Sequence, residues 1–410
     1  MQCVILVGGR GTRLGRLVDD CPKPLLPVAG RPFLAYLIEN LARYGFDDFV
    51  LLAGYRAEAV EEFAVSGVPV FEGTEPRIRV LTESRPLGTA GALKNAGNAL
   101  AAQFLMLNGD CLFDVNFLDL TVPRNDSNWL ARLALRQVGD ASRYGVVALS
   151  GSGLITDMKD RPDGPGPGLI NGGIYWMRRE ILEAIPDGEC SIEQTIFPDL
   201  ARRGLLRGSV YDGVFLDIGV PDDYARSQQL VPDRRRRPAV FFDRDGVLNH
   251  DAGYTHRIEE FRWIDGAREA IRLVNDAGWF AFVVTNQAGV ARGLYDEADV
   301  QRLHRWMNDD LRNGGAHIDA FRYCPYHVDG VVDRARLGAM VFEDRAAIAR
   351  LEAIVHPLVR EAETDFRKQA AEEGRRVVLL DIPLLFEVGS ENRVDIVVLV
   401  STSLEIQRKR

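Results

Sequence analysis

The sequence is poor in lysine, in cysteine and in long apolar runs. Five of its 410 residues are cysteine, and their odd number and scattered positions argue against a disulfide framework. No run of 18 or more apolar residues occurs, which argues against a membrane-spanning helix. The net charge of −9 argues against a general nucleic-acid binder. Chemistry that requires a lysine has five candidates in the whole chain: Lys23, Lys94, Lys159, Lys368 and Lys409.

The composition is that of a globular protein, with 46% hydrophobic and 27% charged residues. A length of 410 residues is sufficient for two or three domains with substantial cores. The first residues, MQCVILVGGRG, have the pattern of a buried strand and lack the regions that define a signal peptide. We therefore expect a cytoplasmic protein that binds neither membranes nor nucleic acid; a homo-oligomer is compatible with the sequence.

Apolar runs alternate with amphipathic stretches in the first part of the chain. Residues 3–9 and 48–54 have the pattern of buried strands, and residues 32–45 and 59–65 that of helices. Such alternation predicts an α/β fold with a mostly parallel sheet and helices on both faces. A boundary is expected at VPDRRRRP, residues 231–238, where the arginine run is interpreted as a solvated linker or, alternatively, a local anion patch.

A glycine-rich loop, LVGGRGTRLG, directly follows the first predicted strand. Gly8, Gly9 and Gly11 allow positive φ angles and close backbone approach, so that successive N–H groups can surround an anion. A helix that begins after the loop would add its positive end. Arg13 and Lys23 can neutralise phosphate charge, although a glycine turn in this place also occurs for packing reasons alone.

Six motifs occur in one order along the first 230 residues: GGRGTRL, PKPLLPVAGRP, PLGTAGAL, LNGD, NGGIY and FLDIGVPDDY. Together they resemble the sugar-1-phosphate nucleotidyltransferase family, whose fold is a Rossmann-like, GT-A-like α/β domain. The subgroup with the greatest resemblance comprises the guanylyltransferases that act on D-glycero-D-manno-heptose 1-phosphate. That closer match depends partly on the second motif set described below, because heptose pathways use both activities.

The resemblance implies in-line attack of a sugar phosphate on the α-phosphorus of a nucleoside triphosphate, here GTP, with release of pyrophosphate. It implies that Asp110 and Asp217 hold Mg²⁺, which prefers oxygen ligands, while Lys23 and Arg13 stabilise the phosphates. Without the family context, the two aspartates would be interpreted as a turn residue and a helix N-cap. The implied nucleotide-binding residues are Gly8, Gly9, Gly11, Thr12, Gly88 and Thr89, and the implied sugar-binding residues are Asn171, Gly172, Glu193 and Arg161.

One segment departs from the family pattern. Family members carry Glu-Lys before the NGG motif, where the lysine binds the sugar phosphate, but this chain has Asp160-Arg161. Arg161 could supply the charge, although a planar guanidinium fork differs from a point charge. Lys159 is the alternative ligand.

A second motif set begins at FFDRDGVLN, residues 241–249, and continues with TNQAGVARG, residues 285–293. It resembles haloacid dehalogenase-type phosphatases of the heptose-bisphosphate and histidinol-phosphate group. The resemblance implies Asp243 as nucleophile and Asp245 as acid/base, both on a second Mg²⁺, and it implies Thr285, Asn286 and Arg292 as phosphate ligands. The lysine and the later acidic pair of that family are missing, which predicts an impaired phosphatase. Cys324 and His327 supply at most half of a zinc site.

The last part of the chain resembles dephospho-coenzyme A kinase. The resemblance is carried by residues 332–360 and by VVLLDIPLLFE, residues 377–387, in which Asp381 is the implied substrate contact. An ordinary helix pair capped by a buried strand would also give this pattern. The chain contains no Gly-Lys dipeptide, so the phosphate loop GxxxxGK[ST] of such kinases is missing.

We therefore expect four segments: a nucleotidyltransferase domain at residues 1–231, a linker at 232–238, a partial haloacid dehalogenase-like Rossmannoid domain at 239–330, and a partial P-loop-kinase-like α/β segment at 331–410. The expected activity is Mg²⁺-dependent guanylyl transfer to a heptose 1-phosphate. The alternatives are a heptose 1,7-bisphosphate phosphatase, a protein of coenzyme A biosynthesis that lacks kinase activity, and a scaffold role for the rear half.

Overall fold

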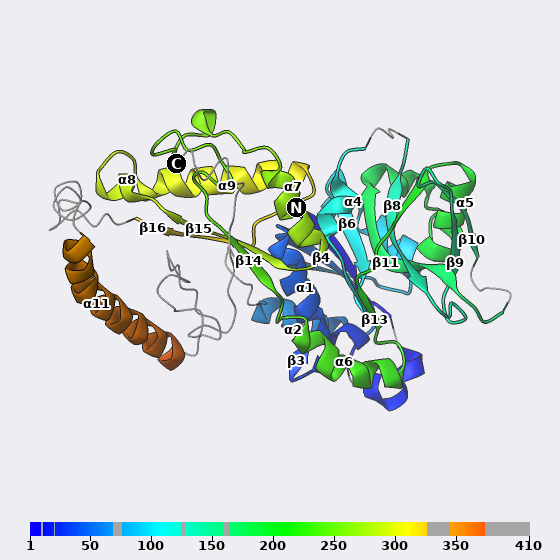
Figure 1. The fold of residues 1–410 in the computed structure, drawn as a ribbon. Coiled ribbons are helices and arrows are strands. Elements are labelled where there is room, and N and C mark those ends of the chain that lie inside the picture. Colours follow the sequence, from blue (N-terminus) through cyan, green and yellow to red (C-terminus); the bar gives the residue numbers. More distant parts are fainter. Residues whose placement is uncertain are drawn as a thin grey trace. The chain divides into compact units, whose positions relative to one another are not determined.

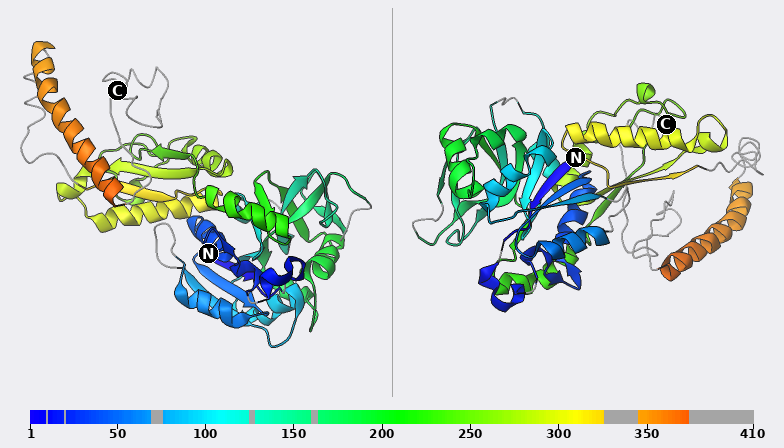
Figure 2. Two further views of the ribbon diagram at one scale, coloured as in Figure 1. Left: turned by 90° about the horizontal axis from the view of Figure 1, so that it is seen from below. Right: turned by 180° about the vertical axis from the view of Figure 1, so that it is seen from behind.

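The computed structural model describes residues 1–9, 11–19, 21–68, 76–124, 128–159, 164–325 and 345–373. The chain divides into two compact units. The first comprises Met1–Thr285 and Ala298–Arg322, and the second comprises Asn286–Glu297 and Tyr323–Arg410. Figure 1 labels the elements, and Figure 2 gives two further views of them.

A nine-stranded sheet forms the centre of the first unit. Its order is β10-β9-β11-β6-β1-β4-β5, with β8 paired to β11 and β12 paired to β8. The strands are β1 (Gln2–Leu6), β4 (Asp48–Ala53), β5 (Arg77–Thr82), β6 (Gln103–Asn108), β8 (Ala131–Val138), β9 (Val146–Leu149), β10 (Ile155–Lys159), β11 (Gly168–Arg178) and β12 (Leu206–Val210).

The expectation of a mostly parallel sheet is correct for one half of this sheet only. Strand β1 runs parallel to β4 and β6, and β4 runs parallel to β5. Strand β11 is instead antiparallel to β6, β8 and β9. Strand β10 is antiparallel to β9 because the connection between them is short, and a parallel crossover needs a dozen or more residues. The pairing of β11 with β6 and β8, which lie much earlier in the sequence, depends on which strands meet in space.

The sheet is buried on both faces, because alternate residues of its strands enter two different cores. From β1, Cys3 and Ile5 enter a core with α1 (Phe33–Arg43) and α2 (Ala57–Ser66). Val4 enters the other core, with α3 (Gly88–Asn95) and α5 (Phe197–Arg202). A period of two residues places successive side chains on opposite faces, which explains the continuous apolar run in the sequence.

A separate two-stranded sheet carries the site described below. Strand β7 (Cys111–Asp114) pairs antiparallel with β13 (Val214–Asp217). Helix α4 (Phe117–Thr121) follows β7, and α6 (Pro221–Asp233) follows β13. The remaining short elements of this part are β2 (Pro27–Val28), β3 (Arg31–Pro32), the 3₁₀ helices η1 (Thr12–Val18), η2 (Lys23–Leu25), η3 (Gly97–Ala99) and η4 (Arg179–Ala184), and one π-helical turn, η5 (Ile192–Ile196).

The second α/β pattern in the sequence forms a three-stranded sheet. Strand β14 (Ala239–Phe242) is parallel to β15 (Phe280–Asn286), and β16 (Ala320–Cys324) completes the order β14-β15-β16. Helix α7 (Ala267–Asp276) connects the parallel pair, and η6 (Ile258–Glu260) precedes it. Leu303, Met307 and Leu311 of α9 (Glu297–Asn313) share a core with Val283 of β15, and Figure 2 shows α9 in yellow along this sheet.

The second unit contains α8 (Ala288–Ala291) and α11 (Arg345–Glu372). No helix among the described residues is long and apolar enough to cross a membrane.

Three of the four arginines after α6 form ion pairs with other parts of the chain, which a solvated linker would not do. Arg234 and Arg237 both form ion pairs with Asp114, whose side chain is 2% exposed. Arg235 pairs with Glu39 at 2.9 Å. A buried carboxylate requires paired cations, and this requirement draws the arginines inward.

Candidate functional site

The two carboxylates expected to hold a metal lie together at one end of the small sheet. Register pairing places Asp217 opposite Cys111, next to Asp110, and the amide of Ile218 donates to the carbonyl of Asp110 at 3.1 Å. Gly109 lets the turn before β7 lie against the end of β1, because a methyl group on Gly109 would lie 2.6 Å from the carbonyl oxygen of Leu6. The LNGD and FLDIG motifs therefore meet at the carboxyl end of β1.

Lys23 joins the two carboxylates. Its Nζ lies 2.5 Å from Asp110 Oδ2 and 3.2 Å from Asp217 Oδ1, and its side chain is 6% exposed. Burial opposes the charge of this ammonium, but Asp110 and Asp217 outweigh burial and raise the pKa of Lys23 above its ordinary value. Lys23 is therefore a cation at neutral pH, held at the start of η2 by the rigid PKP sequence.

The glycine loop and Arg13 border the same charges. Gly11 has φ +63°, and a methyl group on it would lie 3.3 Å from Cβ of Lys23. A methyl group on Gly8 would lie 3.2 Å from the amide nitrogen of Gly54, whereas one on Gly9 would meet no described atom within 4 Å. Thr12 begins η1, a 3₁₀ helix that is kinked at Gly15, whose conformation is non-helical.

Gly219 marks the point where three charged groups converge. A methyl group on it would lie 2.7 Å from Asp217 Oδ1, 2.9 Å from Lys23 Nζ and 3.2 Å from Arg13 Nη2. Its amide also donates to Asp217 Oδ1 at 2.8 Å. Gly219 lies inside the FLDIGVPDDY motif, yet we did not assign it a role from the sequence.

The segments expected to bind nucleoside and sugar are joined by hydrogen bonds. Thr89 Oγ1 donates to Glu193 Oε2 at 2.9 Å and accepts from the amide of Ile192 at 2.8 Å. Gly88 begins α3 with φ +69°, and a methyl group there would lie 2.5 Å from the carbonyl oxygen of Cys190. Glu193 belongs to the π-helical turn η5, a distortion frequent at functional sites.

The NGGIY motif lies at a bulge of β11 and continues this network. Asn171 Nδ2 donates to the hydroxyl of Tyr175 at 2.9 Å, and that hydroxyl lies 3.4 Å from Glu193 Oε1. Burial and the charge of Glu193 raise the pKa of Tyr175 well above its ordinary value, so its hydroxyl stays protonated. Gly172 is required for packing, because a methyl group there would collide with the ring of Phe113 on β7. The sugar-side residues are thereby packed against the strand that follows Asp110.

Two residues near the carboxylates carry no sequence signal that we recognised. Arg143 forms an ion pair with Asp223 at 3.1 Å. The ring of Tyr144 lies 5.9 Å from that of Phe215. Burial raises the pKa of Tyr144, and the charge of Asp217 raises it further. Of the remaining predicted residues, Lys159 is exposed at the end of β10, whereas Asp160 and Arg161 lie outside the described residues.

The aspartates of the second motif are bound to the residue between them. Arg244 is fully buried, and its Nη2 donates to Asp245 Oδ2 at 2.8 Å and to the carbonyl of Thr255 at 2.7 Å. Asp243 Oδ1 accepts from the amide of Arg244 at 2.7 Å, and Thr285 Oγ1 lies 3.5 Å from Asp245. The FFDRDG motif therefore contains its own cation, whose role we did not recognise in the sequence.

The other predicted phosphate ligands belong to the second unit. Asn286 is exposed at the end of β15, and exposed Arg292 directly follows α8. Cys324 is exposed and, within the described part of the chain, forms no disulfide. His327 and Asp381 lie outside the described residues.

Comparison with known proteins agrees with this arrangement. The family described as Nucleotidyl transferase matches residues 2–234, and the family described as Dephospho-CoA kinase matches residues 312–410. The D-glycero-alpha-D-manno-heptose 1-phosphate guanylyltransferase of Campylobacter jejuni is 33% identical over 224 residues, which cover 55% of this chain and 97% of the relative. The solved structure of HddC from Yersinia pseudotuberculosis complexed with GMP-PN is 29% identical with a TM-score of 0.50, covering 56% of this chain and 98% of that one.

The second motif set has a relative of its own. The D-glycero-beta-D-manno-heptose-1,7-bisphosphate 7-phosphatase of Rhodopseudomonas palustris is 52% identical over 102 residues, 25% of this chain. The chain spans only 57% of that relative's length.

The mixed sheet and the glycine loop belong to an α/β nucleotidyltransferase fold, and the paired carboxylates with their lysine form its candidate site. The chain belongs to the nucleotidyl transferase family, and the three-part resemblance expected from the sequence is confirmed.

Proposed function

We propose that residues 1–231 transfer a guanylyl group from GTP to a heptose 1-phosphate and release pyrophosphate, in the cytoplasmic synthesis of a nucleotide sugar. The observation that carries the proposal is the buried ammonium of Lys23 between Asp110 and Asp217, beside Arg13 and the glycine loop. The base and the sugar are taken from the named relatives, and they belong to the proposal.

The donor set at this site fits Mg²⁺. Among the described residues, Asp110, Cys111 and Asp217 place one candidate ligand atom each within 4.8 Å of one another. Burial and the two carboxylates raise the pKa of Cys111 well above its ordinary value, so the thiol stays protonated. Two carboxylate oxygens then remain, and Mg²⁺ binds such oxygens together with substrate phosphates. When bound, the ion would neutralise phosphate charge.

The residues of the chain would act mainly by charge and position. An oxygen of the sugar phosphate attacks the α-phosphorus in line, and the bond to pyrophosphate breaks, so that no covalent enzyme intermediate is needed. Lys23 and Arg13 would counter the charge of the triphosphate. Gly88 and Thr89 would meet the nucleoside, whereas Asn171 and Glu193 would orient the sugar through the network described above.

The proposal is tested with the purified full-length chain, Mg²⁺, GTP and heptose 1-phosphate, by following pyrophosphate. We expect Asp110→Asn to abolish release, because the amide lacks the charge that the site requires. Asp187→Asn is the matched control, since Asp187 is 97% exposed and pairs with Lys94. Release by Asp110→Asn at the wild-type rate would refute the assignment. Mannose 1-phosphate and the other nucleoside triphosphates establish whether the sugar and the base are those proposed.

We also propose that the phosphatase-like part is impaired. The support is that Arg244 is fully buried against Asp245, so this cation is withdrawn from any substrate phosphate. The sequence has no lysine between Lys159 and Lys368. A phosphate dianion approaching Asp243 would therefore lack the cation that relatives provide.

A further inference from the structure

A single stretch, residues 110–119, connects the carboxylate site with the phosphatase-like segment (residues 239–322). Asp110 contacts Lys23 at the start of the stretch. Four residues later, Asp114 Oδ2 accepts from Arg234 at 2.8 Å and Asp114 Oδ1 accepts from Arg237 at 3.0 Å. Arg237 also donates to the carbonyl of Gly278, in the phosphatase-like segment, at 3.0 Å.

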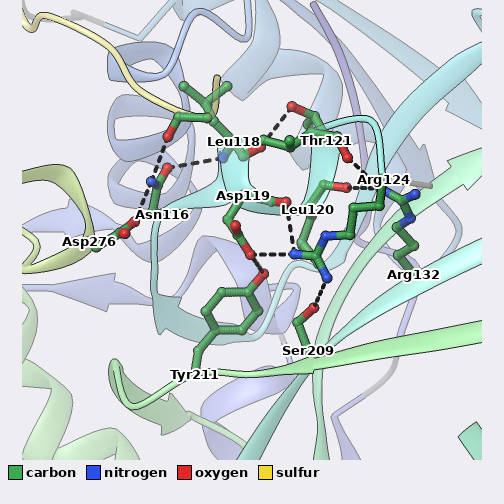
Figure 3. Close-up of polar contacts among 12 residues, drawn as sticks. Asn116, Leu118, Asp119, Leu120, Thr121, Arg124, Arg132, Ser209, Tyr211 and Asp276 are labelled. Atoms are coloured by element: carbon green, nitrogen blue, oxygen red, sulfur yellow. Dashed lines mark hydrogen bonds and ion pairs between the residues drawn. The ribbon is translucent and has the colours of Figure 1, made fainter. Parts of the chain in front are cut away.

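The end of the same stretch contacts that segment directly. Asn116 Nδ2 donates to Asp276 Oδ1 at 2.7 Å and to the carbonyl of Gly315 at 2.8 Å, and Asn116 is 4% exposed. Figure 3 shows Asn116 between Asp276 and the first turn of α4. Asp119 pairs with Arg272 and also accepts from Tyr211 and Arg124. Three successive polar anchors thus tie one end of this stretch to the segment.

Strand β7 connects these anchors to both carboxylates. Strand β7 has four residues, and all four are paired with β13, from Asp114↔Val214 to Cys111↔Asp217. The two strands approach each other closely at this end, because a methyl group on Gly213 would overlap the carbonyl of Asp114. Loss of Arg234 or Arg237 would leave the buried carboxylate of Asp114 without one of its neutralising cations. Burying an incompletely paired charge costs free energy, and a shift of β7 that exposes Asp114 to water would lower that free energy.

We propose that the phosphatase-like segment is a positioning element of the nucleotidyl site: through Asp276 and Arg272, and through Arg237, which its Gly278 carbonyl holds, it keeps β7 in place so that Asp110 and Asp217 stay in register for metal binding. This inference rests on the proposed function and gives the rear part a role that does not require phosphatase chemistry. Arg237 and Asp276 are positioning residues, because they act through Asp114 and Asn116.

The test uses full-length Arg237→Met and measures Mn²⁺ binding by the electron paramagnetic resonance of free Mn²⁺, together with the Mg²⁺ concentration for half-maximal pyrophosphate release. We expect roughly tenfold weaker Mn²⁺ binding and a similar rise in the Mg²⁺ requirement, as for other residues that orient metal ligands. Arg237→Lys should restore part of both. The control is Arg236→Met, which alters the exposed neighbour in the same run. Asp276→Ala, at a 42% exposed side chain, is the milder second variant should Arg237→Met not fold.

Unchanged Mn²⁺ binding in folded Arg237→Met and Asp276→Ala, with only a lower melting temperature, would overturn the inference and leave these contacts a purely structural role. Wild-type protein that binds Mn²⁺ through Asp110 but releases no pyrophosphate would refute the proposed function alone. In that case, weaker Mn²⁺ binding by Arg237→Met would still support the positioning role.

Discussion

At the scale of single residues, Gly219 is the position where a small change should have the largest effect. A methyl group there would enter the space between Asp217, Lys23 and Arg13. We expect Gly219→Ala to fold normally and to lower kcat/KM for pyrophosphate release by about 100-fold, because misplacement by one ångström in a phosphoryl-transfer site costs that order of rate. Steady-state kinetics with circular dichroism as the fold check measures this effect.

Gly151→Ala is the matched control, since a methyl group on Gly151 would meet no described atom within 4 Å. A Gly219→Ala enzyme as active as this control would show that the three charges do not converge as the structure has them.

Single residues also show how far a sequence can be interpreted. Asp110, Asp217 and Lys23 are recognisable because their motifs are specific, and the structure brings them together. Gly219 and Arg244 were overlooked for a physical reason. Gly219 matters because it has no side chain, which leaves room for the three charged groups around it. The role of Arg244 depends on whether its guanidinium faces solvent or the core. Neither property is visible before the chain is folded.

At the scale of elements, helix α9 controls the environment of Arg244. Nε2 of His304, on α9, lies 3.3 Å from Nη1 of Arg244, and the imidazole ring of His304 stacks on Phe321. Because the guanidinium only donates, Nε2 of His304 must accept, so the ring is neutral. Burial and the charge of Arg244 lower the pKa of His304 to about 3 from an ordinary value of 6.5.

This depressed pKa makes stability depend on pH in a defined direction. Between pH 6.5 and 3 the unfolded histidine binds a proton and the folded one does not, so its contribution favours folding at higher pH and is lost as pH falls. The slope approaches about 1.4 kcal/mol per pH unit. We expect His304→Gln, which keeps an acceptor but does not titrate, to show a weaker loss of stability between pH 7 and 4.5. Urea denaturation followed by tryptophan fluorescence measures it.

Wild-type protein at the same pH values provides the comparison, because other acidic groups and His317 titrate equally in both proteins. Parallel stability curves for the two proteins would contradict a buried, neutral His304.

Strands and helices in the parallel half of the sheet follow from sequence periodicity, as β1, α1, β4 and α2 show. The antiparallel placement of β11 did not follow, because it depends on which neighbours β6 meets in space. The arginine run after α6 was misinterpreted for a similar reason. Its partners, Asp114 and Glu39, lie far away in the sequence.

At the scale of the whole molecule, two sets of catalytic motifs occur in one chain, and we expect only the first to act. With a heptose 1,7-bisphosphate and Mg²⁺, phosphate release by the full-length chain should stay at background, and Asp243→Asn should not change it. The reason is that Arg244, the cation of this motif, is buried against Asp245. Phosphate detection measures the reaction, and intact pyrophosphate release by Asp243→Asn shows that the protein is folded.

Phosphate release that is well above background and disappears in Asp243→Asn would contradict this expectation. The second site would then obtain its cation from elsewhere in the chain.

The sequence by itself determined the family and the order of its three resemblances, and it predicted Lys23, Asp110 and Asp217 as site residues, because these depend on motifs whose residue types the chemistry requires. Only the tertiary structure decided that Asp110 and Asp217 lie at the same end of the β7–β13 pair, that Arg244 turns inward, and that Asp114 and Asn116 bind residues more than a hundred positions away. Burial and long-range pairing are properties of the folded chain, and they arise when charges removed from water must find partners that local sequence does not supply.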